Sequence, residues 1–374
     1  MEGVDAHTGS VLHHFASLKD PRIDRTKRHD LLEIIVIALC GVLCGADSWV
    51  EIAEFGQAKH AWLKQFLRLP NGIPSHDTFG RVFALLDPQA FQQCFLKWIR
   101  SLSQRTQGEV VAIDGKTLRR SFDRAAGHSA LHLISAWACQ NRLVLGQLRT
   151  DAHSNEITAI PQLLHLLDVT GCLVTIDAIG TQRQIAAALT TAGADYVLAL
   201  KANQATAFEE VRLFLDDWAT SHPPAETVDK DHGRLEVRRA WLSDEIGWFQ
   251  DKAAWAHLTS VGMIEAQRTL HGQTQTQRRY YLCSLPAQAL TRFASTVRAH
   301  WSIENALHWS LDVTFHEDHS RVRKAHAPEN LATLRRLALS LLKRETSRQG
   351  GIKVRRLRAA CDNDYLAEVL LQKI

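Results

Sequence analysis

Two short runs of β-branched and apolar residues, each ending directly in an aspartate, most limit the folds open to this chain. The first run is Val110–Ile113, followed by Asp114, and the second is Leu173–Ile176, followed by Asp177. A carboxylate at the end of a buried strand is costly unless it faces a cleft, a partner or a metal ion. In an open α/β sheet the carboxyl ends of the strands form the binding crevice. If the two strands are parallel neighbours, both acids point into one place.

A local role for each aspartate is the alternative. Either residue could begin a turn or cap a helix, and Asp177 directly precedes Ala178, Ile179, Gly180 and a predicted helix. For one such acid alone the local role is the better interpretation. Two of them in one region favour a functional site.

A third candidate acid lies in the segment Arg298–Asp318. Glu304, His308 and Asp312 follow one another at intervals of four residues, which places them on one face of a helix. A solvated, charged face is the common outcome of such a pattern. Glu304 lies between two tryptophans, which argues against simple solvation. The other acids to consider, should Glu304 prove wrong, are Asp312, Glu317 and Asp318.

The residues around Glu304 carry further expectations. We expect His300, Asn305 and His308 to surround the third acid and to support it. Trp301 and Trp309 are expected to pack in the interior rather than to stack on nucleic-acid bases. Among the other histidines, His13, His14, His128 and His132 have no partner at zinc-site spacing, so ordinary polar roles are predicted for them.

The hydrophobic pattern divides the chain into regions. Apolar residues recur at three- and four-residue spacing before residue 105, which predicts helices. Strand-like runs then form a hairpin and afterwards alternate with helices, which is typical of an α/β domain. We predict an all-helical N-terminal domain (1–105), an α/β domain (106–345) with a β-rich insertion at about 220–290, and a basic C-terminal tail (346–374).

Composition excludes several classes of protein. With 45% hydrophobic and 22% charged residues the chain can bury a core, so a disordered or fibrous protein is not expected. The N-terminus lacks the pattern of a secretory signal, and Leu31–Leu43 is too short to span a bilayer. None of the seven cysteines forms a zinc-type pair, which fits a reducing cytoplasm. The net charge of +4 permits nucleic-acid binding without implying it.

Several short motifs together resemble one family, the DDE transposases of bacterial insertion sequences, of the H-repeat-associated type. These motifs occur in the family's order and cover nearly the whole chain: Phe15–Arg22, Ala112–Lys116, Ser154–Ile157, Thr175–Ala178, Leu200–Gln204, His232–Arg234 with Glu236, and His300–Asn305.

The resemblance implies an RNase H-like catalytic core, in which Asp114, Asp177 and Glu304 are the catalytic acids and metal ligands. It also explains the β-rich insertion between the second and third acids. Three carboxylates suit Mg²⁺, a hard cation that prefers oxygen ligands, and Mn²⁺ is expected to substitute. By hypothesis Asp114 bridges two ions, Asp177 holds one and Glu304 the other. Water would first free a 3′-hydroxyl, which would then attack target DNA.

One departure from the wider transposase group concerns the signature of Tyr, Arg, Glu and Lys around the third acid. The corresponding residues here are Val297, His300, Glu304 and Leu311. Only the glutamate is kept, so the flanking residues that grip phosphate do not carry over.

Basic residues near the three acids are the predicted DNA contacts, although each one alone could be an ordinary surface charge. They are Lys116, Arg119, Arg120, Lys201, Arg298, Arg321, Arg323 and Lys324. The expected partners are double-stranded DNA, as the element's terminal repeats and its target, and a second copy of the chain when DNA is bound. The helical region would read the DNA ends, and His60–Arg81 could hold a helix-turn-helix. We expect action in the bacterial cytoplasm, on the nucleoid, and no membrane partner.

Three other functions stay open at this point. A nuclease of the same fold would use the same acids without joining strands. A retired transposase would keep DNA binding alone, although the presence of all three acids speaks against it. A metallohydrolase acting on other substrates would need histidine ligands at the strand ends, and none is present there.

Overall fold

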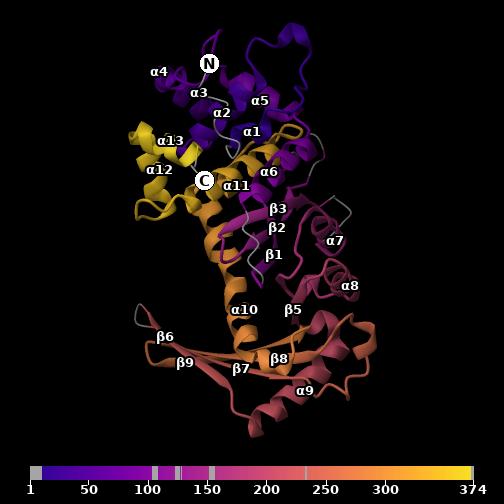
Figure 1. The fold of residues 1–374 in the computed structure, drawn as a ribbon. Helices are drawn as coiled ribbons and strands as arrows, with labels where there is room; N and C mark the ends of the chain where they lie inside the picture. Colours follow the sequence, from indigo (N-terminus) through magenta and orange to yellow (C-terminus); the bar gives the residue numbers. More distant parts are fainter. Residues whose placement is uncertain are drawn as a thin grey trace.

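The centre of the molecule is one mixed sheet. The computed structural model describes residues 11–102, 108–122, 127, 129–150, 156–231 and 234–371, and the strands in it form one nine-stranded sheet (Figure 1). The strands are β1 (Val110–Thr117), β2 (His132–Ala138), β3 (Leu143–Arg149), β4 (Leu173–Ile176), β5 (Asp195–Leu200), β6 (Ala225–Asp231), β7 (Arg234–Ser243), β8 (Ser260–Leu270) and β9 (Gln273–Cys283). Their order is β3-β2-β1-β4-β5-β9-β8-β7-β6. The predicted mixed α/β architecture is confirmed.

The two acid-bearing strands are parallel neighbours. In their register Ile113 of β1 is paired with Ile176 of β4. Asp114 and Asp177 are the next residue on each strand, so both lie at the same edge of the sheet. Because the two strands are parallel neighbours, both carboxylates can face one site, as the sequence predicts.

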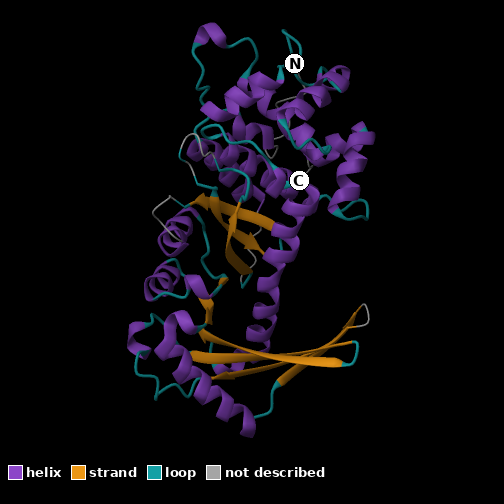
Figure 2. Ribbon diagram, turned by 180° about the vertical axis from the view of Figure 1, so that it is seen from behind, coloured by secondary structure: helices purple, strands orange, loops and turns teal. Residues whose placement is uncertain are grey.

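The insertion extends the same sheet. β9 pairs antiparallel with β5, with Leu200 opposite Tyr280, and β8, β7 and β6 follow outward. Figure 2 shows the long strands of the insertion, in orange, at the bottom of the molecule. A β-rich insertion was expected here, whereas its junction with β5 was not. Because of this junction, residues of β9 lie beside the ends of the acid-bearing strands.

Helices fill the N-terminal region. They are α1 (Val11–Phe15), α2 (Leu31–Leu43), α3 (Trp49–Ala58), α4 (His60–Leu63), α5 (His76–Leu85) and α6 (Pro88–Leu102). α2 begins where the carboxylate of Asp30 accepts the backbone N–H groups of Leu32 and Glu33. Residues 64–75 separate α4 from α5, which is longer than the turn of a helix-turn-helix, so that hypothesis was wrong.

Helices cover both faces of the core strands. α7 (Glu156–Leu166), α8 (Arg183–Thr191) and α9 (Ala205–Ser221) share one hydrophobic cluster with Val111 and Ile113 of β1. On the other face, α10 (Leu290–Ser302) continues through η6 (Ile303–His308) and η7 (Ser310–Thr314) as the long helix of Figure 1. The alternation along β1 turns Ala112 and Asp114 toward this second face.

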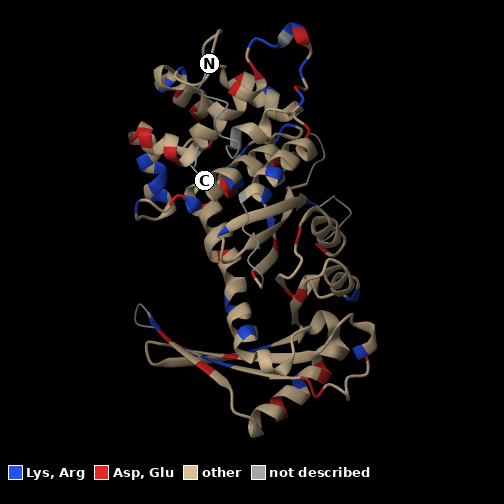
Figure 3. Cartoon of the chain, viewed as in Figure 1, with Lys and Arg blue, Asp and Glu red and all other residues tan. Residues whose placement is uncertain are grey.

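The residues on the second face of the sheet belong to the same hydrophobic core as the N-terminal helices. η8 (Glu317–His319) leads to α11 (Ala327–Arg344), whose apolar residues pack in one cluster with α2, α5 and α6. Basic C-terminal residues lie in α12 (Ile352–Cys361), where the ribbon of Figure 3 is blue at Lys and Arg positions, and α13 (Asn363–Leu371) follows it.

Some predicted features lie outside the described residues. These are His128, residues 103–107 of the predicted boundary, Ser154 and Asn155, and His232 and Gly233. Within the described ranges, no helix combines the length and the apolar character needed to cross a bilayer.

Candidate metal centre

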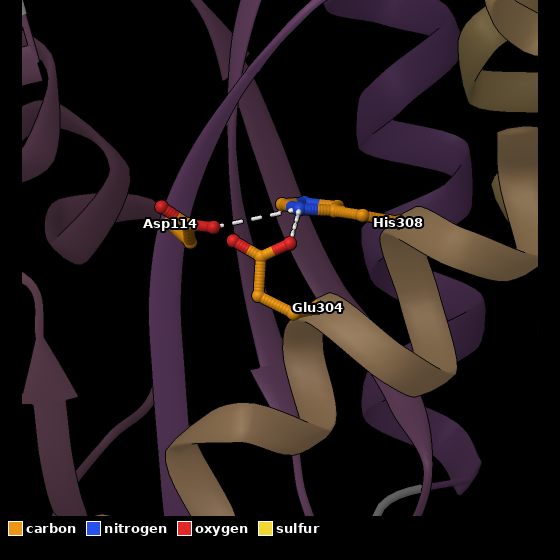
Figure 4. Close-up of side chains that lie close together, drawn as sticks. All are labelled: Asp114, Glu304 and His308. Carbon is orange, nitrogen blue, oxygen red and sulfur yellow. Dashed lines mark ion pairs between the residues drawn. The ribbon is translucent and has the colours of Figure 1, made fainter. Parts of the chain in front are cut away.

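Asp114, Glu304 and His308 form a tight cluster between strand β1 and the long helix. Each offers a possible ligand atom, and these atoms lie within 4.8 Å of one another. Nδ1 of His308 is 3.4 Å from Oδ2 of Asp114 and 3.7 Å from Oε2 of Glu304 (Figure 4). The imidazole is buried and points at both carboxylates. The structure therefore brings the first and third predicted acids together and adds a histidine.

The helix that carries Glu304 and His308 has wide π turns at this point. Ile303, Leu307 and Leu311 are buried in the core, which holds the helix against the sheet. Glu304 and His308 each follow one of these anchors and face β1. Single π turns inside α-helices are frequent at functional sites.

Asp177 lies on the wall of the same cavity, outside the tight cluster. The cavity holds about 430 Å³ and is lined by Asp114, Asp177, Lys201 and Glu304, among others. The carboxylate of Asp177 accepts the backbone N–H of Ile179 at 3.2 Å, so it also has the local capping role considered above. Burial and the nearby Glu156 raise the pKa of Asp177.

The electrostatics of the cluster are those of crowded acids. Burial, together with the neighbouring Glu304, raises the pKa of Asp114 to about 8. The hydrogen bond from His308 lowers the pKa of Glu304 to about 2. Acids forced together in this way compete for a proton, and a cation between them relieves the strain. Groups with strongly shifted pKa values in a cleft are typical of functional sites.

A fourth carboxylate, that of Glu156, was not predicted as part of the site. Its Oε1 lies 2.9 Å from Nε2 of His132. Both side chains press on Gly115, where an added Cβ would come within 2.1 Å of Oε1 of Glu156 and within 2.6 Å of the His132 ring. A larger residue directly after Asp114 would therefore have to displace the ends of these two side chains. Glu156 belongs to the family motif Ser154–Ile157, and this was the signal in the sequence that could have identified it.

The residues predicted to surround Glu304 differ in how far they are exposed to solvent. His300 is half-buried in the cavity wall, and its partial removal from water lowers its pKa to about 4. Asn305 is exposed. The expectation that the two tryptophans are interior was wrong, because Trp301 is 40% and Trp309 58% exposed. The guanidinium of Arg279 lies over the Trp301 ring at 4.7 Å, so a residue of the insertion helps to wall the cavity.

The predicted DNA contacts do not lie together. Lys201 lines the cavity of the acids. Arg321, Arg323 and Lys324 line a separate hollow of about 1090 Å³ beside α3 and α5. Nε of Arg323 donates to the carbonyl of Arg120 at 3.1 Å.

The remaining three basic residues are engaged in ion pairs. Arg298 pairs with Asp229, and Arg119 with Asp318 at 3.3 Å. Lys116 is only 8% exposed and contacts three carboxylates, so its ammonium is not free to meet DNA.

The donor set suits a hard divalent cation. Carboxylate oxygens of Asp114 and Glu304 and one imidazole nitrogen converge, and a further carboxylate stands on the cavity wall. Carboxylate oxygen suits Mg²⁺ and Mn²⁺, and imidazole is accepted by several transition ions. Among the described residues, no cysteine lines this cavity.

This sequence is similar to known proteins and matches two family models. A family model described as DDE_Tnp_1-associated matches residues 12–99, and one described as Transposase DDE domain matches residues 105–341. The chain is 50% identical over 276 residues to "Uncharacterized protein in dhlA 3'region" of Xanthobacter autotrophicus, covering 72% of this chain and 92% of that protein.

Two further matches cover almost the full chain. The "H repeat-associated putative transposase YhhI" of Escherichia coli (strain K12) is 36% identical over 368 residues, covering 96% of this chain and 97% of that protein. The cryo-EM structure of a piggyBac transposase synaptic complex with hairpin DNA matches with a TM-score of 0.43 and 11% identity, covering 97% of this chain and 78% of that chain.

Proposed function

Because the chain belongs to the family of transposases with a DDE domain, we propose that it cuts and joins DNA using divalent ions held by Asp114, Asp177 and Glu304. The observation that carries this proposal is the convergence of Asp114 and Glu304 within ligand distance. Asp177, at the end of the parallel neighbouring strand, supplies the third carboxylate.

An RNase H-like catalytic core is part of the proposal. The strand order β3-β2-β1-β4-β5 supports this core. Of these five strands, β1, β3, β4 and β5 run in one direction, and β2 runs in the opposite direction. The proposed division at about residue 105 is supported by the limits of the two family models. Within the proposed basic tail, Lys353, Arg355, Arg356 and Arg358 lie in α12, and α13 follows without Lys or Arg.

The proposed ions are Mg²⁺, with Mn²⁺ able to substitute. Such ions activate the attacking oxygen and stabilise the leaving oxygen of a phosphodiester. Asp114 would contact both ions, Asp177 one and Glu304 the other. His308 holds Glu304 toward Asp114 and keeps its carboxylate ionised. The walls formed by His300 and Trp301 would orient the scissile phosphate and limit access of water.

Double-stranded DNA is the proposed partner. Lys201 would contact the strand beside the acids, and the hollow lined by Arg321, Arg323 and Lys324 would hold the flanking duplex against α5. Arg119, Arg120 and Arg298 are proposed as outer phosphate contacts. Pairing of two element ends would need two copies of the chain. The proposed place of action is the bacterial cytoplasm, where the chromosome lies.

The test is cleavage of a labelled duplex that carries the element's own end. We expect strand cutting in Mg²⁺ or Mn²⁺, no cutting in EDTA or Ca²⁺, and joining of the freed 3′ end to a supercoiled plasmid. Cutting without joining would favour a nuclease instead. Binding without cutting would favour a retired transposase, and cutting that persists in EDTA would contradict the metal-dependent mechanism.

A further inference from the structure

A cluster of charged side chains around the buried Lys116 lies two residues along β1 from Asp114 of the candidate metal centre. Lys116 is two residues after Asp114, so the alternation of a strand turns both side chains to the same face. Its ammonium donates to Asp312 of η7 and, at 3.3 Å, to Oδ1 of Asp318. A third carboxylate, that of Glu317, is 3.6 Å away.

Strand β1 and the long helix are thus joined by polar contacts at two successive positions of the strand, which we call the first and second levels. At the first level Asp114 of β1 meets Glu304 and His308. At the second level Lys116 of β1 meets Asp312, which lies four residues beyond His308. Two contacts along one strand fix both the axial position and the rotation of a helix, whereas one contact leaves sliding possible.

Burial gives the second level its rigidity. The Lys116 side chain is 8% exposed and that of Asp312 is 35% exposed. If the helix slid, the buried ammonium would lose its hydrogen bond to Asp312 and keep only the contacts with Asp318 at 3.3 Å and Glu317 at 3.6 Å, so sliding carries a cost. Hydrogen bonds to a charged group are also the stronger kind.

We propose that the Lys116–Asp312 ion pair positions the third acid, by holding the long helix in the register that brings Glu304 to Asp114. Neither residue touches the reacting atoms, so both are positioning residues. This role replaces the DNA contact predicted for Lys116, and it rests on the proposed metal centre. Asp312 and Asp318, considered as alternative metal ligands, are engaged by the lysine instead.

Asp318 provides a matched control. It accepts from the same ammonium, but it lies in η8, beyond the end of the helix that carries Glu304. Asp312→Asn and Asp318→Asn therefore make the same chemical change around the same lysine. Only the first removes a charge that holds the helix.

The experiment is a Mn²⁺ titration of the full chain followed by electron paramagnetic resonance, with thermal unfolding measured in parallel. The relevant site is the one that Asp114→Asn removes. We expect Asp312→Asn to weaken Mn²⁺ binding there about tenfold, as for other residues that orient metal ligands. Asp318→Asn should stay within about twofold of the parent chain at a similar melting temperature.

Three results would overturn the inference or its basis. Equal weakening by both variants would show that the cluster contributes general stability alone. Unchanged binding in Asp312→Asn, with binding lost in Asp114→Asn, would refute the positioning role and leave the metal centre intact. If the parent chain and Asp114→Asn bind Mn²⁺ alike, the proposed metal centre itself fails.

Discussion

Replacing Asp114 with asparagine is expected to abolish metal-dependent DNA cleavage and, at the same time, to stabilise the metal-free protein. Cleavage should fall at least about a thousandfold, because several kcal/mol of transition-state stabilisation depend on the ions that this carboxylate holds. Stability should rise by on the order of 1–2 kcal/mol at pH 8, since active-site groups are often held at a cost to the fold.

The gain in stability should depend on pH. Because the pKa of Asp114 is raised to about 8, the folded chain keeps its proton at pH values where the unfolded chain has lost it. The stability of the parent protein contributed by this group therefore falls as pH rises from about 4 to about 8. Asparagine does not titrate, so the advantage of Asp114→Asn should be small at pH 4 and largest near pH 8.

Denaturant unfolding in EDTA at several pH values measures this effect. Asp217→Asn, an exposed aspartate on α9, is the control and should change neither cleavage nor stability. A variant that loses stability at pH 8, or that still cuts DNA at the parental rate, would contradict the role given to Asp114.

The second large effect is a loss of stability when the buried ion pair between Arg336 and Glu317 is broken. Nη1 of Arg336 lies 2.8 Å from Oε1 of Glu317, and both side chains are fully buried. Arg336→Leu should cost about 3–5 kcal/mol of unfolding free energy, because it removes the hydrogen-bonded partner of the buried Glu317 and leaves only the longer-range attraction of Lys116 and Arg335. Urea unfolding followed by tryptophan fluorescence measures the loss.

Two comparisons make this prediction specific. The double variant Arg336→Leu with Glu317→Leu should recover much of the stability, since neither member of this buried pair is then left without the other. Arg212→Leu breaks the Arg212–Glu209 pair, which has the same 2.8 Å separation but is exposed, and should cost less than about 1 kcal/mol. A loss of similar size in Arg336→Leu and Arg212→Leu would contradict the account.

Much of the fold follows from local pattern. The runs before Asp114 and Asp177 predict buried strands, and the alternation after residue 220 predicts the insertion. The pairing of β9 with β5 could not be read in the same way, because alternation identifies a strand without identifying its neighbour. The arrival of Glu304 beside Asp114 was implied by family resemblance alone.

The sequence contained signals that could have corrected two wrong predictions, the first of which was the burial of Trp301 and Trp309. Ile303, Leu307 and Leu311 mark the buried side of the long helix, and Trp301 and Trp309 are offset from that line by two residues. A shift of two residues turns a side chain to roughly the opposite face of a helix. The tryptophans were therefore predictable as exposed residues.

The burial of Lys116 had a similar signal. A residue two positions after Asp114 on a strand shares its face, which is covered by the long helix. The three carboxylates that surround the ammonium come from a segment distant in sequence, so the partners themselves could not be predicted.

The most direct test of the central claim compares the parent chain with Glu304→Gln on a labelled duplex carrying the element's end, in Mg²⁺ and in Mn²⁺. Glutamine keeps the size of the side chain and removes the charge that holds the ion. The account predicts that the variant binds this duplex as tightly as the parent chain and does not cut it. Cutting by Glu304→Gln at the parental rate would contradict the assignment of the third acid.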